Sequence, residues 1–176
     1  ETLASIPSIV YGIFGYLIFV VGFSVGDAKW FGWGYTILGG GLTLAIMVLP
    51  LIVKSTEEAI REVPNSLREA SFALGAGKAK TVFSIVLPSA APGIFTAVIL
   101  SIGRVVSESA VLLLTVGMVV NIVPTGPMSA GTSLALDVYY FSTYGYAKEA
   151  GAASFVLMIL VLVLNVLAYV LMWLLK

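Results

Sequence analysis

Four long apolar stretches give the chain its pattern. They cover about residues 5–25, 33–53, 92–116 and 151–175, and each is close to the ~20 residues that a helix needs to cross a bilayer. No internal repeat and no water-soluble domain interrupts them. The pattern predicts an all-α membrane protein, a polytopic bundle of four transmembrane helices that forms a single domain over residues 1–176.

Charge is concentrated in the polar segment at residues 54–88. Nine of the 18 charged residues lie between Lys54 and Lys80, and five of these nine are Lys or Arg. Because cytoplasmic loops of membrane proteins carry an excess of Lys and Arg, we expect this segment to lie in the cytoplasm. Residues 117–148 are rich in Gly, Pro and Ser, and we expect an extracytoplasmic loop there with a short helix near residues 133–141. Both termini then lie on the cytoplasmic side of the cell membrane.

A short helix is expected inside the cytoplasmic segment. Pro64 stops any helix from upstream, and Ser66 and Glu69 have the spacing of a capping box. Gly75 is a natural left-handed stop. The apolar positions share one face, at Leu67, Ala70 and Leu74. A two-turn helix with a shallow apolar face is typical of a segment that docks on another protein, although packing on its own chain is the alternative.

Glycine and proline punctuate the predicted spans. Gly39-Gly40-Gly41 favours close packing against another helix. We expect Pro50 to kink the second span just before the polar loop, and Pro92 to occupy the first turn of the third.

Composition excludes several classes of function. The chain is 60% hydrophobic and 10% charged, unlike a soluble domain, and it has neither Cys nor His. Disulfides, thiol chemistry and His/Cys metal sites are therefore excluded, and a net charge of zero argues against nucleic acid as a partner. Residues 75–78, Gly-Ala-Gly-Lys, lack the remaining positions of a phosphate-binding P-loop. We expect no cofactor, no metal and no enzymatic activity in this chain.

Two ionisable residues lie about halfway along the third predicted span. Arg104 and Glu108 are four residues apart, so on a continuous helix they share a face and can pair. Ionisable groups at membrane depth are costly and usually mark a pathway or a partner. The alternative is a buried salt bridge that only orients helices. The candidate residues of a substrate path are Arg104, Glu108, Ser101 and Ser107.

The polar loop resembles the "EAA" loop of ABC-importer permeases. Glu69-Ala70, Gly75, Ile85 and Leu87-Pro88 match its spacing, and Ser71 replaces the third residue of the Glu-Ala-Ala motif. In that family the loop forms the coupling helix, which sits in a cleft of the cytoplasmic ATPase subunit. The resemblance therefore implies ATPase coupling by Leu67, Arg68, Glu69, Ala70, Ser71, Leu74, Gly75 and Ala76.

The whole chain resembles the phosphate-specific transport permeases. The segments that carry the likeness are Ile6 to Gly12, Thr56 to Ala59, Val63-Pro64, Leu67 to Ser71, and Gly103-Arg104 with Glu108. One departure is Ser107-Glu108-Ser109, where that family commonly has Gly-Glu-Thr. The short return after this region is more similar to the A-type than to the C-type subunit of the permease pair.

This resemblance implies a type I ABC importer permease with phosphate as substrate. The subunit would have six helices, so two would precede Glu1, which is also not a methionine. The implied partners are a dimer of cytoplasmic ATPase subunits, a second, C-type permease subunit, an extracytoplasmic phosphate-binding protein and the lipid bilayer. Arg104 would offer its guanidinium to phosphate oxygens, and Glu108 would hold that guanidinium in place.

Two other functions remain open from the sequence. The coupling loop is shared across substrates, so the solute could be another oxyanion or a small molecule. The chain could also be a non-transporting membrane scaffold whose loop recruits a cytoplasmic partner. The charges at Arg104 and Glu108 favour transport, because a scaffold needs no ionisable groups at membrane depth.

Overall fold

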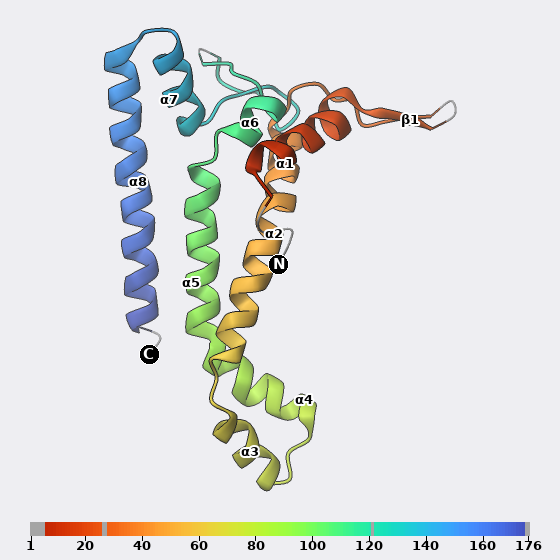
Figure 1. The fold of residues 1–176 in the computed structure, drawn as a ribbon, viewed down its shortest axis with the longest axis vertical. Coiled ribbons are helices and arrows are strands. Elements are labelled where there is room, and N and C mark those ends of the chain that lie inside the picture. Colours follow the sequence, from red (N-terminus) through yellow and green to blue (C-terminus); the bar gives the residue numbers. More distant parts are fainter. Residues whose placement is uncertain (1–5, 26–27, 121, 175–176) are drawn as a thin grey trace. The chain divides into compact units, whose positions relative to one another are not determined.

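The computed structural model describes residues 6–25, 28–120 and 122–174. The regular secondary structure of the described part is helical apart from one short hairpin, and loops connect the elements (Figure 1). It forms two compact units, Glu1–Pro50 with Gly103–Leu162, and Leu51–Ile102 with Val163–Lys176. In chain order, the elements are α1 (Ser8–Gly15), the π-helical η2 (Tyr16–Val21), β1 (Phe23–Val25), β2 (Ala28–Trp30), α2 (Ile37–Arg61), α3 (Asn65–Ala73), α4 (Lys78–Thr81), the π-helical η3 (Val82–Val86), α5 (Leu87–Val106), α6 (Ala110–Thr115), α7 (Leu134–Thr143) and α8 (Ala147–Leu174).

Three helical segments of the described residues are long and apolar enough to cross a membrane. They are Ile37–Arg61, Lys78–Val106 and Ala147–Trp173. A fourth apolar helix, Ser8–Val21, is shorter. The predicted class of an all-α membrane bundle is confirmed, with the second, third and last apolar stretches as its long helices.

The first predicted span, residues 5–25, is not one helix. The helix ends at Val21, and the chain turns back as the antiparallel pair β1–β2, in which Phe23 is opposite Trp30. Gly22 makes this reversal possible, because its φ is +76° and a Cβ would lie 2.6 Å from the Gly32 nitrogen. Glycine is thus required at the base of the hairpin, and the sequence pattern alone did not show this.

The two helices that border the polar loop extend beyond their predicted ends. α2 continues past Pro50 to Arg61, and the helical run Lys78–Val106 contains both Pro88 and Pro92. The chain therefore does not restart at Pro92 as predicted. Helices in membrane proteins tolerate proline because neighbouring groups and local π-helical turns take up the freed carbonyls, and η3 is such a turn, which ends two residues before Pro88. The segment that connects the two helices is therefore shorter than the predicted polar loop and comprises residues 62–77.

Glycine allows the helices of the first unit to pack closely. A Cβ on Gly40 would overlap the Val116 side chain, and one on Gly15 would overlap Thr43. Gly39 and Gly40 are buried, which confirms the close packing expected from the glycine triplet, whereas Gly41 has open space around it. The hydroxyl of Thr43 donates to the Gly39 carbonyl at 2.7 Å and so stays satisfied although buried.

The segment before α7 closes the N-terminal end of α2. The first amide groups of a helix have no partner within it. Here the N–H of Ile37 donates to the Ser129 carbonyl at 3.0 Å, and the N–H of Leu38 donates to the Pro127 carbonyl at 2.8 Å. The short helix predicted near residues 133–141 is α7, which Ser133 caps by accepting from the Leu136 N–H at 3.2 Å.

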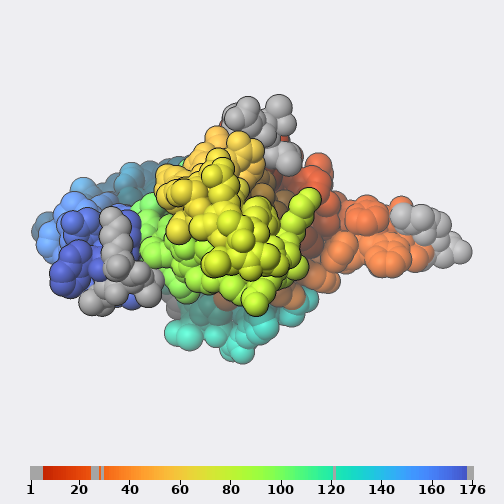
Figure 2. Space-filling model, turned by 90° about the horizontal axis from the view of Figure 1, so that it is seen from below, coloured from red at the N-terminus to blue at the C-terminus, as the bar shows by residue number. Residues whose placement is uncertain are grey.

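The second unit has a small core beneath the polar loop. Its buried residues are Val63, Val86 and Ala90, and the half-buried Ile60 and Ile94 pack against them. A Cβ on Gly93 would lie only 2.8 Å from the Ala59 Cβ, so α5 passes very close to α2 here. Figure 2 shows one open surface facing the viewer, in yellow to yellow-green. It is formed by α3, α4 and the C-terminal end of α2.

Candidate functional site

Helix α3 is the centre of the candidate coupling site, and it begins two residues earlier than predicted, at Asn65 instead of Leu67. It starts at Asn65, directly after Pro64. Ser66 therefore lies inside the helix, and no side chain caps this end, so the predicted capping box with Glu69 is wrong. The physical reason is Pro64, whose extended backbone sets the start of the helix and whose carbonyl accepts the N–H of Leu67 at 3.2 Å.

The other end of α3 stops as predicted, at Gly75. Its φ of +79° lies in the left-handed region that glycine adopts most easily. The N–H of Gly75 donates to the Phe72 carbonyl at 2.9 Å, and the N–H of Ala76 donates to the Ser71 carbonyl at 3.1 Å. These two bonds form a Schellman motif, which fixes the direction in which the chain leaves the helix.

Arg68 ties α3 to the end of α2. Its guanidinium donates to the carbonyl of Ile60 at 2.9 Å, in the last turn of α2. A cation is favourable there because the unpaired carbonyls give the end of a helix a partial negative charge. The side chain is half-buried, and its Nε has no partner among the described residues. Arg68, predicted as a coupling residue, thus positions the helix within its own chain.

Ser71 faces inward and joins α3 to α4. Its hydroxyl lies 2.9 Å from that of Thr81, and both residues are buried, with 4% and 2% of their surfaces exposed. Since the Thr81 hydroxyl donates its one hydrogen to the Gly77 carbonyl at 3.2 Å, Ser71 is the donor to Thr81. The replacement of the family's alanine by serine is therefore matched by a hydroxyl on the facing helix.

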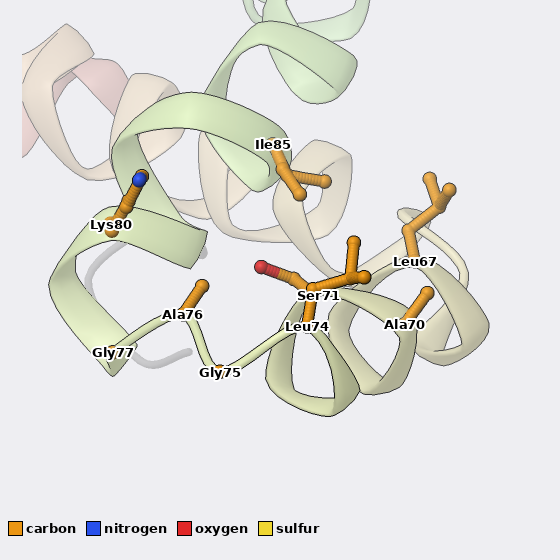
Figure 3. A pocket seen from close by; sticks show the side chains of 9 residues that line it. All are labelled: Leu67, Ala70, Ser71, Leu74, Gly75, Ala76, Gly77, Lys80 and Ile85. Atoms are coloured by element: carbon orange, nitrogen blue, oxygen red, sulfur yellow. The ribbon is translucent and has the colours of Figure 1, made fainter.

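An apolar pocket of about 430 Å³ opens beside α3 (Figure 3). Its walls are Leu67, Ala70, Ser71, Leu74, Gly75, Ala76, Gly77, Lys80 and Ile85. The three apolar residues predicted to share one face of α3 all line it. Six of the eight predicted coupling residues belong to the walls, and Arg68 and Glu69 do not. Sequence reasoning missed Gly77 and Lys80, which follow the helix stop, and used Ile85 only as part of the family motif.

One face of α3 thus packs on the chain and another stays open. Ser71 is buried, whereas Leu74 is 89% exposed at the edge of the pocket, and Leu67 is 41% exposed. Exposed apolar residues that gather around a pocket, as Leu67, Ala70 and Leu74 do here, are typical of a surface that binds another protein. The packing of α3 on its own chain is therefore observed along one face, whereas docking of its open face on another protein stays a prediction.

The structure does not bring Arg104 and Glu108 together. α5 ends at Val106, so Arg104 lies in its last turn and Glu108 lies beyond it. The Glu108 carboxylate instead accepts the N–H of Ala110 at 3.2 Å, at the start of α6. Arg104 is exposed and makes no ion pair or hydrogen bond with any described residue. The predicted pair is wrong because the helix that would have aligned the two residues breaks between them.

The two serines proposed for the path bond to their own helix. Ser101 is buried, and its hydroxyl donates to the Ala97 carbonyl at 2.8 Å. Ser107 is exposed, and its hydroxyl donates to the Gly103 carbonyl at 3.0 Å. Among the residues that the structure describes, no group of three or more His, Cys, Asp or Glu could hold a metal ion.

Comparison with known proteins decides the family. Residues 1–176 match the family described as "Binding-protein-dependent transport system inner membrane component". The chain belongs to this family. Its place is therefore the inner membrane, and its long apolar helices are those of a permease of the ABC transporter class.

Relatives within this family are named as transport permeases. "Probable ABC transporter permease protein YqgI" of Bacillus subtilis is 42% identical over 184 residues, covering 96% of this chain and 60% of the relative. "Phosphate transport system permease protein PstA 2" of Mycobacterium bovis is 41% identical over 129 residues, covering 73% of this chain and 40% of the relative. "Probable ABC transporter permease protein YqgH", also of Bacillus subtilis, is 33% identical over 92% of this chain and 52% of the relative. The chain thus spans less than two thirds of the length of each, and the predicted resemblance to phosphate permeases is confirmed.

A solved structure shares the fold. The chain matches the inward-facing MetNI methionine ABC transporter with a TM-score of 0.71 and 24% identity, covering 99% of this chain and 71% of that one. At this identity the likeness concerns the fold, which confirms the type I importer permease architecture.

Proposed function

We propose that this chain is a permease subunit of an ATP-driven importer of inorganic phosphate, in which it forms half of the translocation path. Family membership supports the transport role, and relatives named as phosphate transport permeases at about 41% identity support the substrate. The single observation that carries the coupling role is the pocket beside α3, with the exposed Leu74 at its edge.

Coupling would take place at this pocket. The helix is fixed within its own chain by Arg68 at one end and by the Schellman motif at the other, while its open face is apolar. A cytoplasmic ATPase subunit would hold α3 in a cleft, and closure of the ATPase dimer would move α3 as a rigid element. ATP hydrolysis then belongs to the partner, and this chain is not an enzyme.

In this proposal, Arg104 would bind phosphate during its passage through the subunit. The guanidinium is exposed, and it stays charged at any working pH and matches oxyanions bidentately. Glu108 is occupied at the start of α6, so Arg104 would act without the carboxylate that the sequence suggested as its holder. The exposed Ser107 could add a hydroxyl, whereas the buried Ser101 serves packing.

Three further partners complete the proposal. They are a second, C-type permease subunit, the second copy of the ATPase and an extracytoplasmic phosphate-binding protein. In this arrangement the segment 62–77 faces the cytoplasm and residues 117–133 face the opposite side.

Reconstitution of the importer in vesicles tests the proposal. We expect phosphate uptake that needs ATP, and ATPase activity that rises when the phosphate-loaded binding protein is present. Uptake of another solute instead of phosphate would favour the second candidate, an importer of a different oxyanion or small molecule. That candidate is supported by the methionine transporter that shares the fold and by the relative YqgI, whose name gives no substrate. ATPase binding without any transport would point to a scaffold.

A further inference from the structure

The helical run Lys78–Val106 has a wide turn where it leaves the candidate coupling site. After η3, the N–H of Leu87 donates to the Val82 carbonyl, five residues back instead of the four of an α-helix. The next residue, Pro88, has no N–H to donate. The hydrogen-bond ladder is therefore irregular at two successive positions, and here the run changes direction between α4 and α5 (Figure 1).

The buried residues of this run show what the wide turn does. They lie five, four, seven and four residues apart, and they are Thr81, Val86, Ala90, Ala97 and Ser101. Steps of four and seven stay on one face of an α-helix, whereas a step of five would place Thr81 and Val86 about 140° apart around the axis. Because a π-helical turn holds more residues, Thr81 and Val86 are both buried on the side of α3 and its core.

On one side of the wide turn, hydrogen bonds join three helices into one body. The Arg68 guanidinium donates to the Ile60 carbonyl at 2.9 Å and fixes α3 to the end of α2. The hydroxyls of Ser71 and Thr81 lie 2.9 Å apart and fix α3 to α4. The last turn of α2, with α3 and α4, thus forms a coupling arm, residues 58–81.

On the other side, small apolar contacts hold α5 against the coupling arm. Val63 packs with Val86 and Ala90 in one small core. A Cβ on Gly93 would lie 2.8 Å from that of Ala59, so α5 and α2 pass each other there almost backbone to backbone. The side chains at this second contact are too small to interlock.

Directional bonds do not tie the coupling arm to α5. Within the described chain, no hydrogen bond or ion pair joins residues 58–81 to residues 87–106. Apolar contact is non-directional, so α5 can shift against the arm without breaking a bond. The wide turn itself is lightly packed, because Val82 and Phe83 are 46% and 70% exposed. The run therefore bends here at a lower cost than in a regular α-helical turn.

We propose that η3 and Pro88 form a joint, at which the coupling arm swings as one body while α5 keeps its own direction. The inference rests on the proposed importer, in which closure of the ATPase dimer moves α3. Because the arm includes the end of α2, its swing turns α2 against α5 about the close contact at Gly93. Bending is thus confined to one of the two connections between the coupling site and the long helices.

Two locks on the complete importer test where the chain bends. The first is a disulfide between Ser71→Cys and Thr81→Cys, at positions whose hydroxyls lie 2.9 Å apart in a chain without cysteine. It closes the arm on itself, so ATP-driven phosphate uptake should be unchanged. The second is a short bifunctional thiol reagent that joins Phe83→Cys to Leu87→Cys across the wide turn. It should lower uptake about tenfold or more and leave the bound ATPase in place.

Each lock has a matched control. The cysteine variants without oxidant or reagent should transport as the unmodified chain does. The same reagent across Val163→Cys and Leu167→Cys, at positions that are each 51% exposed on α8, should have no effect. Uptake that survives the lock across the wide turn, or that is lost with the disulfide, would overturn the joint. An unmodified complex that moves no phosphate would instead contradict the proposed function.

Spin-label distances follow the movement without relying on transport. With one label on an introduced cysteine at Phe72 on α3, a second is placed at Glu58 on α2 or at Phe95 on α5, and all three positions are exposed. On addition of ATP and vanadate to the complex, the distance from Phe72 to Phe95 should change by about 2 Å or more. The distance from Phe72 to Glu58 should stay constant. Equal changes in both distances, or no change in either, would overturn the proposal.

Discussion

Arg104 shows how much a single side chain depends on where its helix ends. The sequence placed it on a continuous span with Glu108, and four residues of helix would have brought the two charges together. The break at residues 107–109 instead leaves the guanidinium exposed and gives the carboxylate to the start of α6. Neither residue type signals such a break, because helix ends depend on tertiary packing as well as on local preference.

The first prediction concerns Arg104. We expect Arg104→Gln to lower the phosphate uptake rate by about tenfold to a hundredfold, since a hydrogen bond from a charged group contributes about 1.5–3 kcal/mol. Assembly should be unchanged, because the guanidinium makes no hydrogen bond within the described chain. Uptake in vesicles and size-exclusion chromatography measure the two effects. Arg104→Lys, which keeps the charge but loses the bidentate fork, should fall in between, and normal uptake by Arg104→Gln would contradict a role in the path.

Glu108 offers a second prediction at this scale. If its carboxylate serves only to accept the Ala110 N–H, Glu108→Gln should keep that bond through the amide oxygen and lose little stability. Glu108→Ala should lose about 1 kcal/mol, the usual net contribution of one hydrogen bond. Retention of monodisperse protein after heating compares the two variants. A salt bridge to Arg104 would make both variants equally damaging, which is the opposite pattern.

At the scale of elements, the polar loop was the most predictable part of the chain. Pro64 and Gly75 bounded α3 almost as expected, because both act through their own backbone. The contacts of Arg68 and Ser71 could not be predicted, since their partners, Ile60 and Thr81, lie eight and ten residues away on other helices. The hairpin after Val21 was missed for a related reason. Its apolar residues have the pattern of a membrane helix, and only the close approach of Gly22 to Gly32 in the structure shows that the chain reverses there.

The open face of α3 gives the third prediction. Leu74→Asp should weaken association with the ATPase subunit at least tenfold, because a charge would enter an apolar contact. The variant should fold normally, since Leu74 is 89% exposed and surface substitutions usually change stability by less than about 0.5 kcal/mol. Ala73→Asp is the matched control, with the same charge on an exposed neighbour outside the pocket walls. Co-purification of the ATPase with each variant measures the effect, and equal loss from both would show that charge rather than the pocket matters.

At the scale of the whole molecule, the proposed importer has a defined orientation in the membrane, and this orientation can be tested. The chain has no cysteine, so a single introduced thiol reports one position. Lys78 and Thr125 are both exposed. Lys78 directly follows the segment 62–77, proposed to face the cytoplasm, and Thr125 lies in the segment 117–133, proposed to face the opposite side.

The fourth prediction uses these two positions. In intact cells, a maleimide that cannot cross the membrane should label Thr125→Cys and leave Lys78→Cys unlabelled. After permeabilisation it should label both, which controls for reactivity. Labelling of Lys78→Cys from outside would reverse the proposed topology and, with it, the contact between α3 and a cytoplasmic ATPase.

The hydrogen bond of Arg68 also bears on how efficiently the proposed importer would use ATP. The chain turns a corner at residues 62–64 between α2 and α3, and the bond from Arg68 to the Ile60 carbonyl braces that corner. Without this hydrogen bond, the connection between α2 and α3 would bend when α3 moves, and the movement would be lost as local deformation of residues 62–64. Under the proposed coupling, this hydrogen bond would let a movement of α3 turn the end of α2 instead. The stiffness of this joint would then help to set how many ATP molecules are hydrolysed for each ion that crosses.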